Sequence, residues 1–174
     1  MLIFLTGFMC AGKTTDGRAT ADLLQIPLLD LDAELEHRSG LLISTFIETQ
    51  GIDAFRRLES DILLNTEQLL TTQITSPSSL PQAIIATGGG CVLRPENRSY
   101  LSQPNHLTIW LNLPFELLYD RLSLTSRPLL QDLTKDEIYR IYAERLPYYR
   151  MSANLEITTQ PIPEQIAALF PQQS

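Results

Sequence analysis

Short apolar runs alternate along the chain with stretches whose apolar residues recur at helical spacing. The apolar runs predict five strands, at residues 2–6, 27–31, 83–87, 106–111 and 155–158. Because these runs are almost continuously apolar, they fit parallel strands that are covered on both faces. The helical spacing predicts helices over residues 13–24, 54–70 and 135–149, and a last helix with Pro163 and Glu164 in its first turn. This alternation predicts an α/β fold with a mostly parallel sheet.

Two local signals refine the prediction. Thr134 and Glu137 have the spacing of a capping box, which places the start of a helix at residue 135. Residues 71–82 are rich in Ser, Thr and Pro and predict an exposed loop. That segment is too short to link two domains, and the chain shows no internal repeat. We therefore expect one domain over residues 1–174.

Composition and charge narrow the classes of function. Of the 174 residues, 44% are hydrophobic and 19% are charged, an ordinary globular balance. The formal net charge of -7 argues against broad binding to nucleic acid or a membrane surface, because both need a basic face. No apolar run approaches the roughly 18 residues of a membrane span, and the first apolar run is too short for a signal peptide. Cys10 and Cys91 lack metal-site spacing and indicate a reducing, intracellular compartment.

A glycine-rich segment follows the first predicted strand. Residues 7–14, GFMCAGKT, fit the pattern G-x-x-x-x-G-K-[ST]. The glycines let backbone N–H groups point into one concavity that binds phosphate oxygens, and the next helix adds its positive N-terminal end. In this pattern Lys13 reaches the β- and γ-phosphates and the Thr14 hydroxyl reaches Mg²⁺. The alternative is a plain turn with an exposed lysine, which the flanking strand and helix disfavour. The loop predicts binding of ATP or GTP with Mg²⁺, but alone it does not distinguish an enzyme from a switch or a motor.

Acidic residues and glycines follow two further predicted strands. Asp30 and Asp32 end the second strand, and alternation would send both side chains to the side where open parallel sheets bind ligands. One could hold the Mg²⁺ shell through water while the other orients an acceptor hydroxyl or takes its proton; alternatively, Asp32 is a helix N-cap. Residues 88–90 are all glycine, which fits either close backbone approach to a ligand or a plain turn.

Four arginines are candidates for binding an anion. Arg56 and Arg57 lie early in a predicted helix, where the helix dipole disfavours a basic residue, and Glu59 could hold one of them in position. The alternative is a solvated helix face, which suits Arg57 better than Arg56. Arg127 lies in a loop-like stretch from which it could close over a transferring phosphoryl group. Arg145 lies late in a helix, where a contact with the helix dipole is a strong alternative.

Taken together and in this order, these motifs resemble those of the shikimate kinase family over nearly the whole chain. The matching segments are the phosphate loop, DLD at 30–32 with Glu36, Gly40, Ile43 and Phe46 after it, FRRLE at 55–59, ATGGG at 86–90, RPLL at 127–130 and RLPYY at 145–149. Many kinases share the phosphate loop, whereas the combination of D-x-D, F-R-x-x-E, G-G-G and R-P-L-L is far more specific. The resemblance implies ATP-dependent phosphorylation of the shikimate 3-hydroxyl to shikimate 3-phosphate, in chorismate and aromatic amino-acid biosynthesis, with ATP and Mg²⁺.

The resemblance also implies a fold and a role for each matching residue. The fold would be a P-loop kinase three-layer sandwich with a five-stranded, mainly parallel sheet, a mobile lid at roughly 113–132 and a shikimate-binding subregion at roughly 32–60. The catalytic residues would be Asp32, Lys13 and Arg127, with Asp32 as the candidate base and Arg127 as the lid arginine. The nucleotide would contact Gly7, Ala11, Gly12, Lys13, Thr14, Thr15, Arg121, Arg127 and Pro163, with Arg121 and Pro163 flanking the adenine. Shikimate would contact Asp32, Phe46, Phe55, Arg56, Gly88, Gly89, Gly90 and Arg145, with the two arginines clamping its carboxylate. Thr14 and, through water, Asp30 would support the metal.

Three departures from the family pattern stand out. Cys10 occupies a position where the family usually has a small residue such as glycine, and its thiol is either inert, which we favour, or sensitive to oxidation. Ile52 follows Gly51 where the family commonly has glutamate. The 71–82 loop is longer than expected. Neither of the last two changes touches an expected ligand contact, and Cys10 lies in a loop that binds mainly through its backbone.

Other functions fit the sequence less well. They are another small-metabolite kinase, such as a gluconate or nucleotide kinase, a non-catalytic family member with a binding role, and a GTPase switch. The sequence has no motif for a base-recognition pocket and no N-K-x-D segment, while the lysine, aspartate and arginines of a catalyst are all present. We expect a monomer with a small-molecule substrate and no nucleic-acid or membrane partner. Its expected location is the cytoplasm, or the plastid stroma for the mature form of a targeted protein.

Overall fold

The structure, a computed structural model, describes residues 1–71, 80–123, 130 and 133–170. The strands are β1 (Leu2–Thr6), β2 (Leu28–Asp30), β3 (Ala83–Ala86), β4 (His106–Leu111) and β5 (Leu155–Ile157). They form one sheet in the order β2-β3-β1-β4-β5, in which every pair is parallel. The five predicted strands are confirmed, and each boundary differs from the prediction by no more than one residue.

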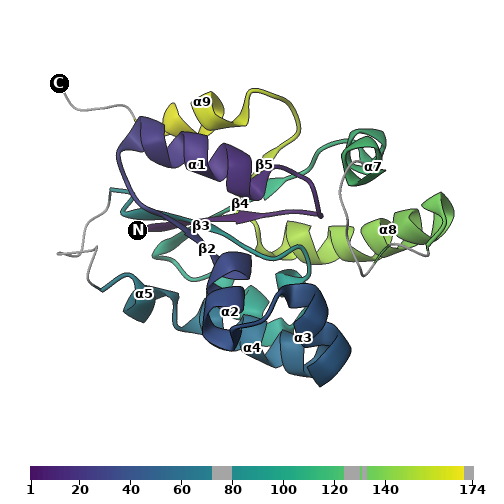
Figure 1. Ribbon diagram of the computed structural model, residues 1–174. Helices are drawn as coiled ribbons and strands as arrows, with labels where there is room; N and C mark the ends of the chain where they lie inside the picture. The colour runs from purple at the N-terminus through teal and green to yellow at the C-terminus, as the bar shows by residue number, and fades with distance from the viewer. Residues whose placement is uncertain (72–79, 124–129, 131–132, 171–174) are drawn as a thin grey trace.

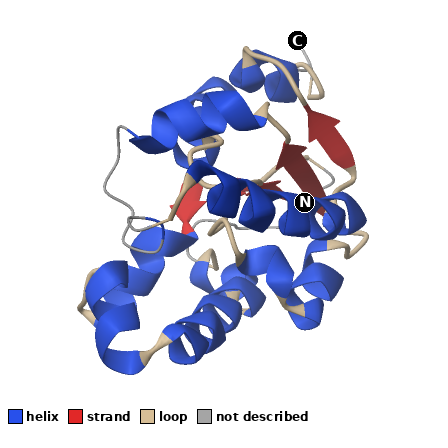
Figure 2. Cartoon of the chain, turned by 90° about the vertical axis from the view of Figure 1, so that its right-hand side faces the viewer, coloured by secondary structure: helices blue, strands red, loops and turns tan. Residues whose placement is uncertain are grey.

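The helices fill the connections between these strands. They are α1 (Lys13–Leu24), α2 (Leu31–Ser39), α3 (Ile43–Gln50), α4 (Ile52–Leu64), α5 (Thr66–Leu69), α6 (Pro95–Leu101), α7 (Phe115–Ser123), α8 (Lys135–Ser152) and α9 (Ile162–Ala167), with a 3₁₀ turn η1 (Cys91–Leu93). Helices α1 and α9 cover one face of the sheet, while α2, α4, α6 and α8 cover the other (Figure 1, Figure 2). The expected three-layer α/β sandwich is confirmed.

The central strand β1 supplies side chains to both faces of the sheet. Ile3 and Leu5 belong to the core under α1 and α9, and Leu2 and Phe4 belong to the core on the opposite face. All four side chains are at most 4% exposed. This double burial explains why the strand sequence is continuously apolar, since burying each such side chain contributes about 1.5–3 kcal/mol. The two cores hold the carboxyl end of β1, and the loop that follows it, in a fixed place.

The order of the strands places a ligand crevice at the end of β1. After β1 the chain passes through α1 to β2 on one side of the sheet, and after β3 it crosses to β4 on the other side. In Figure 1, β1 runs from the labelled N-terminus toward the right, where α1 begins. Adjacent connections that leave a parallel sheet in opposite directions open a crevice at the carboxyl ends of the strands.

Several helix predictions were wrong in their boundaries or missing. The predicted helix over 54–70 is two helices, α4 and α5, separated at Asn65, and α8 continues to Ser152. The capping box at Thr134 and Glu137 is confirmed. Helices α2, α3, α6 and α7 were not predicted, because none is longer than nine residues and so few turns give little periodicity. Most of the predicted loop at 71–82 lies outside the described residues.

Candidate functional site

A pocket of about 420 Å³ lies at the carboxyl ends of the central strands, next to the start of α1. Its walls come from the loop after β1, the first turns of α1 and α2, the loop after β3, α7 and the loop before α9. The lining residues are Met9, Cys10, Gly12, Lys13, Thr14, Thr15, Asp16, Asp32, Thr87, Gly89, Arg121 and Gln160. This is the location at which open parallel sheets bind ligands.

The loop after β1 has the backbone of an anion cradle. Gly7 and Gly12 have φ angles of 144° and 97°, in a region that favours glycine. A side chain at Gly7 would also collide with the backbone, because its Cβ would lie 2.8 Å from the Leu111 carbonyl oxygen. Since Gly12 is the N-cap of α1, no side chain there competes for the first N–H groups of the helix. These groups can therefore bind phosphate oxygens.

Lys13 holds its charge at the mouth of this loop. The side chain is 8% exposed, and its Nζ donates to the carbonyl oxygens of Gly7 at 3.0 Å and Phe8 at 2.9 Å. The loop thus fixes a single positive charge beside the N–H groups that face the pocket. The alternative reading of the motif, a turn with an exposed lysine, does not describe this arrangement.

Thr14 and Asp30 meet beside the loop. The Thr14 hydroxyl donates to Asp30 Oδ2 over 2.6 Å, while Asp30 Oδ1 accepts from the backbone N–H groups of Asp32 and Ala33. Asp30 is therefore the N-cap of α2, and the prediction that Asp30 and Asp32 both end the strand was wrong because this cap starts the helix at Leu31. The hydroxyl and carboxylate oxygens suit Mg²⁺, and no group of three or more His, Cys, Asp or Glu side chains that could hold a metal occurs in the described residues. These donors fit an ion that binds mainly through phosphates and water.

Two carboxyl groups meet over Gly88. A Cβ atom at this position would lie 2.4 Å from Glu59 Oε1 and 2.9 Å from Asp32 Oδ1. Glu59 is 3% exposed, and its Oε1 has no hydrogen-bond donor within the part of the chain that the structure describes. Burial raises the pKa of Glu59, nearby Arg56 lowers it, and Asp32 raises it again. Asp32 lines the pocket in front of this buried carboxyl group.

Arg56 is held by Glu59, as the sequence suggested for one of the two adjacent arginines. Its Nη1 lies 2.7 Å from Glu59 Oε2, and its side chain is 15% exposed. A Cβ atom at Gly90 would lie 2.3 Å from Arg56 Nη2, so the guanidinium covers the backbone of the glycine turn. Arg57, in contrast, is exposed on the outer face of α4, which confirms its interpretation as a solvated residue.

Arg145 reaches the same glycine turn from α8. Its Nη1 donates to the Gly89 carbonyl oxygen over 3.2 Å, and its guanidinium lies 5.5 Å from the ring centre of Phe8 in the phosphate loop. The side chain is therefore directed at the turn, and not at the last carbonyl groups of its own helix. Arg145 and Arg56 therefore bring two guanidinium groups to this turn, and a planar guanidinium suits the geometry of a carboxylate ligand.

Close approach, and not a left-handed backbone, explains the three glycines at 88–90. None of them is among the described glycines with positive φ, which are Gly7, Gly12, Gly40 and Gly51. A Cβ atom at Gly89 would lie 3.2 Å from the backbone nitrogen of Met9, so this residue brings the turn against the phosphate loop. The turn thus joins the anion cradle to the two arginines.

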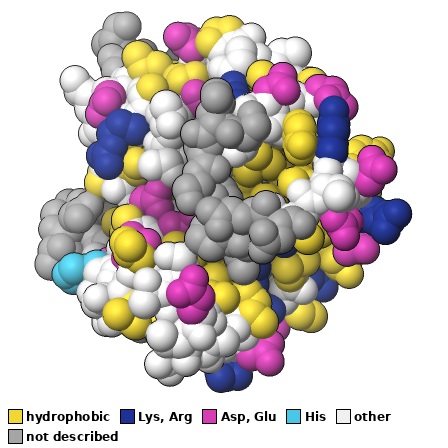
Figure 3. Space-filling model, turned by 45° about the vertical axis from the view of Figure 1, so that its right-hand side comes forward, with side chains coloured by type: hydrophobic (Ala, Val, Ile, Leu, Met, Phe, Trp, Pro, Cys, Tyr) yellow, Lys and Arg dark blue, Asp and Glu magenta, His cyan; other side chains and the backbone are white. Residues whose placement is uncertain are grey.

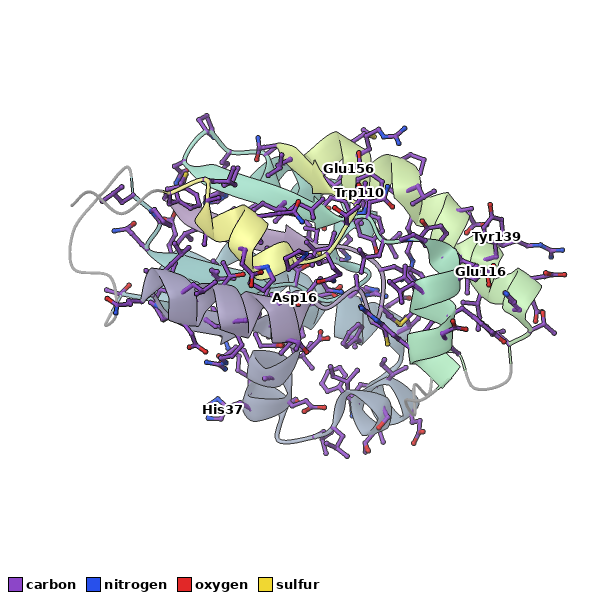
Figure 4. The ribbon with its side chains drawn as sticks, turned by 90° about the horizontal axis from the view of Figure 1, so that it is seen from above. Asp16, His37, Trp110, Glu116, Tyr139 and Glu156 are labelled. Carbon is purple, nitrogen blue, oxygen red and sulfur yellow. The ribbon has the colours of Figure 1, made fainter. Side chains whose placement is uncertain are left out.

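At the opposite end of the pocket, the expected residue Arg121 lies near two residues that the sequence did not single out, Asp16 and Gln160. Arg121 Nη1 donates to the Cys10 carbonyl oxygen over 3.1 Å, and Asp16 and Gln160 line the pocket nearby. Figure 4 labels Asp16 at the start of α1, beside the segment that leads to α9. Burial raises the pKa of Asp16, while the Gln160 side chain and Arg121 lower it. Asp16 was missed because an acidic residue in the first turn of a helix already has a structural explanation.

Cys10, which departs from the family pattern, has a backbone conformation that favours glycine. Its φ angle is 60°, a left-handed conformation that glycine adopts without strain and other residues adopt rarely. This geometry explains why glycine suits the position. The thiol lines the pocket, next to the carbonyl group that Arg121 binds.

Several expected site residues do not line the pocket. They are Gly7, Ala11, Asp30, Phe46, Phe55, Arg56, Gly88, Gly90, Arg145 and Pro163. Phe46 and Phe55 belong to the core beneath α2 and α4, and Phe55 is 4% exposed with the Arg56 guanidinium 4.9 Å above its ring. Pro163 lies in the first turn of α9, and it is Gln160, three residues earlier, that reaches the pocket. Arg127 and most of the expected lid after Ser123 lie outside the described residues.

Comparisons with known proteins point to one family. The family model described as shikimate kinase matches residues 9–173. A shikimate kinase from Aromatoleum aromaticum is 38% identical over 157 residues, covering 89% of this chain and 83% of its own length, and one from Nostoc punctiforme is 39% identical over 169 residues, covering 95% and 86%. The solved structure of shikimate kinase from Acinetobacter baumannii, in complex with shikimate, superposes with a TM-score of 0.82 at 32% identity and covers 97% of this chain and 91% of that one.

Proposed function

We propose that this chain, which belongs to the shikimate kinase family, transfers the γ-phosphoryl group of ATP to the 3-hydroxyl of shikimate. The products are ADP and shikimate 3-phosphate, in a step of aromatic amino-acid biosynthesis, and the reaction uses ATP with Mg²⁺. The observation that carries the proposal is the convergence of Arg56 and Arg145 on one glycine turn beside Asp32. Shikimate is a small polyol acid, so a pair of guanidinium groups next to an aspartate matches its carboxylate and its hydroxyls.

The phosphate loop supplies the nucleotide end of the reaction. Backbone N–H groups of the loop at residues 7–15 bind the β- and γ-phosphates, with Ala11 and Thr15 among the contact residues, and Lys13 neutralises charge on the group in transfer. When bound, Mg²⁺ neutralises negative charge on the phosphate oxygens, and Thr14 and Asp30 are the residues that would hold it. Arg121 and Pro163 flank the adenine in this proposal, and the position of Arg121 in the pocket wall supports its part.

The opposite end orients the acceptor. Arg56 and Arg145 bind the shikimate carboxylate, the backbone of 88–90 contacts its ring hydroxyls, and Phe46 and Phe55 stand behind the ring. Asp32 orients the 3-hydroxyl and receives its proton as the bond to phosphorus forms. Such a transfer depends on alignment and charge neutralisation more than on covalent chemistry. The buried Glu59 carboxylate supports this assignment, because it holds Arg56 in place.

The remaining assignments extend the same proposal. The chain acts as one domain over 1–174, with residues 32–60 as the acceptor-binding subregion and roughly 113–132 as a lid. Arg127, in the lid, stabilises charge on the transferring phosphoryl group. Arg127→Ala should therefore lower kcat more than it changes either KM, and an unchanged kcat would count against this role.

We also propose a monomer that works in the cytoplasm without a nucleic-acid or membrane partner. The net charge of -7 supports this, as does the face in Figure 3, where charged side chains of both signs are scattered and do not form a basic patch. In the described part of the chain, no helix has the length and apolar character needed to cross a membrane. Light scattering after size exclusion tests the monomer directly.

A coupled ADP-release assay tests the proposed activity. The assay would use Mg-ATP with shikimate, with gluconate and with no acceptor. We expect turnover with shikimate alone. Turnover with gluconate would point to a different small-metabolite kinase, and ATP binding without turnover on any acceptor would point to a binding protein.

A further inference from the structure

The carbonyl oxygen of Gly89 accepts two hydrogen bonds from α8. One comes from Arg145 Nη1 and the other from the hydroxyl of Tyr149. A carbonyl oxygen has two lone pairs, so both donors can be accommodated at once. Because Arg145 and Tyr149 are four positions apart on one helix, their side chains lie on the same face and reach the same atom.

Tyr149 is the more rigidly held of the two donors. Its side chain is 0% exposed, and its ring stacks on Trp110 of β4 with a centroid distance of 5.9 Å and an interplanar angle of 19°. Trp110 itself, labelled in Figure 4, is 2% exposed. Burial raises the pKa of Tyr149, which keeps the hydroxyl protonated and able to donate. The ring therefore anchors the Gly89 carbonyl to the core of the sheet.

Arg145 has a long, flexible side chain that needs an external anchor. Its side chain is only partly buried, and it contacts the Gly89 carbonyl, the face of Phe8 and the hydroxyl of Tyr149. A guanidinium that is fixed before the substrate arrives loses less side-chain entropy on binding. Whatever fixes the Gly89 carbonyl therefore also fixes the direction of Arg145.

We infer that Tyr149 is a positioning residue for the acceptor: its hydroxyl fixes the Gly89 carbonyl and contacts Arg145, and it thereby orients Arg145 toward the substrate carboxylate. The inference rests on the proposed function, because Arg145 acts on the carboxylate of shikimate. Tyr149 does not contact the substrate. It acts through Arg145, and its effect should therefore disappear when Arg145 is removed.

A purely structural role for Tyr149 makes a different prediction. Gly89 also packs against the backbone nitrogen of Met9 in the phosphate loop. If the hydroxyl served only to hold the turn together, its loss would disturb the loop as well, and ATP binding would weaken along with shikimate binding. The two Michaelis constants therefore separate the two roles.

The test compares Tyr149→Phe with the matched control Tyr148→Phe. Both variants remove one hydroxyl from α8 and keep the ring, so the stack on Trp110 remains. We expect Tyr149→Phe to raise KM for shikimate about 3- to 10-fold, the usual effect of losing one hydrogen bond, with kcat and KM for ATP within about twofold of wild type. Tyr148→Phe should match wild type in all three parameters.

A double variant completes the test. In the Arg145→Ala background, adding Tyr149→Phe should change kcat/KM for shikimate by less than about twofold. If Arg145→Ala has no measurable turnover, Arg145→Lys provides the background, because a lysine lacks the fixed fork of donors that the carbonyl orients. The inference is overturned if Tyr149→Phe equals wild type, if KM for ATP rises in parallel, or if the effect persists without Arg145. Failure of wild type to use shikimate at all would instead overturn the proposed function.

Discussion

The two ends of the site, the phosphate loop and the glycine turn with its two arginines, are built in different ways. At the nucleotide end, the contacts that hold Lys13 join residues five and six positions apart, to Phe8 and Gly7. At the acceptor end, the contact between Arg145 and Gly89 joins residues 56 positions apart, and the Arg56 guanidinium covers Gly90 from another helix. One short segment can form the phosphate loop with its lysine, whereas the acceptor end exists only when α2, α4, α8 and the turn after β3 are assembled.

This difference has a consequence for substitutions. A change to the Lys13 side chain should affect the nucleotide and the chemistry while leaving the acceptor contacts in place. A substitution at the acceptor end should also displace neighbouring side chains, because Glu59, Arg56 and the glycine turn are in contact with one another. The four predictions that follow move from the first end to the second.

The largest effect should come from Lys13→Ala. Removing the ammonium group at the mouth of the loop leaves charge on the transferring phosphoryl group without its nearest neutralising side chain, so kcat should fall by about 10³-fold or more. The ADP-release assay measures this loss. Lys135→Ala is the matched control, because Lys135 is an exposed lysine paired with Glu116 and should retain wild-type turnover. Substantial turnover by Lys13→Ala would contradict the proposal that Lys13 neutralises charge on the transferring phosphoryl group.

Arg56→Ala should mainly weaken shikimate binding. Truncation removes one carboxylate ligand and leaves Glu59 buried without its ion pair, so we expect a loss of about 2–5 kcal/mol in shikimate affinity. KM for ATP should stay within about twofold of wild type. Calorimetric titration with shikimate measures the change, and Arg57→Ala, on the exposed face of α4, serves as the control. Normal shikimate affinity in the Arg56 variant would contradict the proposal that Arg56 binds the shikimate carboxylate.

Gly90→Ala tests whether the acceptor end is coupled through close packing. The new Cβ would lie 2.3 Å from Arg56 Nη2, and the flexible guanidinium must move away. We expect KM for shikimate to rise about 10-fold, less than for loss of the arginine itself. Gly40→Ala is the control: its φ of 68° makes the variant less stable by about 1 kcal/mol, but open space surrounds the new Cβ and both KM values should be unchanged. Equal KM values for shikimate in the two variants would contradict the proposed coupling between the glycine turn and Arg56.

The smallest effect concerns the pH dependence of stability. Because burial raises the pKa of Glu59 above its ordinary value of 4.5, the folded protein binds a proton there at higher pH than the unfolded chain does. The contribution of this group to stability is therefore present at low pH and is lost as the pH rises through the folded pKa. Glu59→Gln does not titrate, so its free energy of unfolding relative to wild type should increase as the pH rises from below 4.5 through the raised pKa of Glu59.

Urea denaturation of both proteins at a series of pH values measures this difference. Asp53→Asn, in the first turn of the same helix but exposed, provides the control for loss of one carboxylate from α4. A difference that stays constant or shrinks as the pH rises would contradict the assignment of Glu59 as a buried carboxyl group.

The same contrast explains what could be predicted from the sequence. The phosphate loop and the bounds of α1 were predicted correctly, because one contiguous motif carries both the backbone conformation and the lysine. At the acceptor end, each residue by itself allowed a second explanation. Arg145 fitted a contact with its own helix dipole, and the glycines fitted a plain turn, until the fold placed them together.

Other features could not be predicted for related reasons. The break of the predicted helix at Asn65 and the start of α2 at Leu31 depend on single caps, which the apolar pattern does not report. Tyr149 lies within the RLPYY segment, and its spacing from Arg145 was the available signal. Its role depends on a carbonyl group from a distant turn, which no local pattern contains.

The most direct test of the account is a crystal structure of the protein with shikimate and Mg-ADP bound. The account predicts the diphosphate within hydrogen-bond distance of the loop N–H groups and Lys13, and the shikimate carboxylate within hydrogen-bond distance of both Arg56 and Arg145. It also predicts the 3-hydroxyl beside Asp32. A carboxylate bound away from both arginines would contradict the assignment of the two ends.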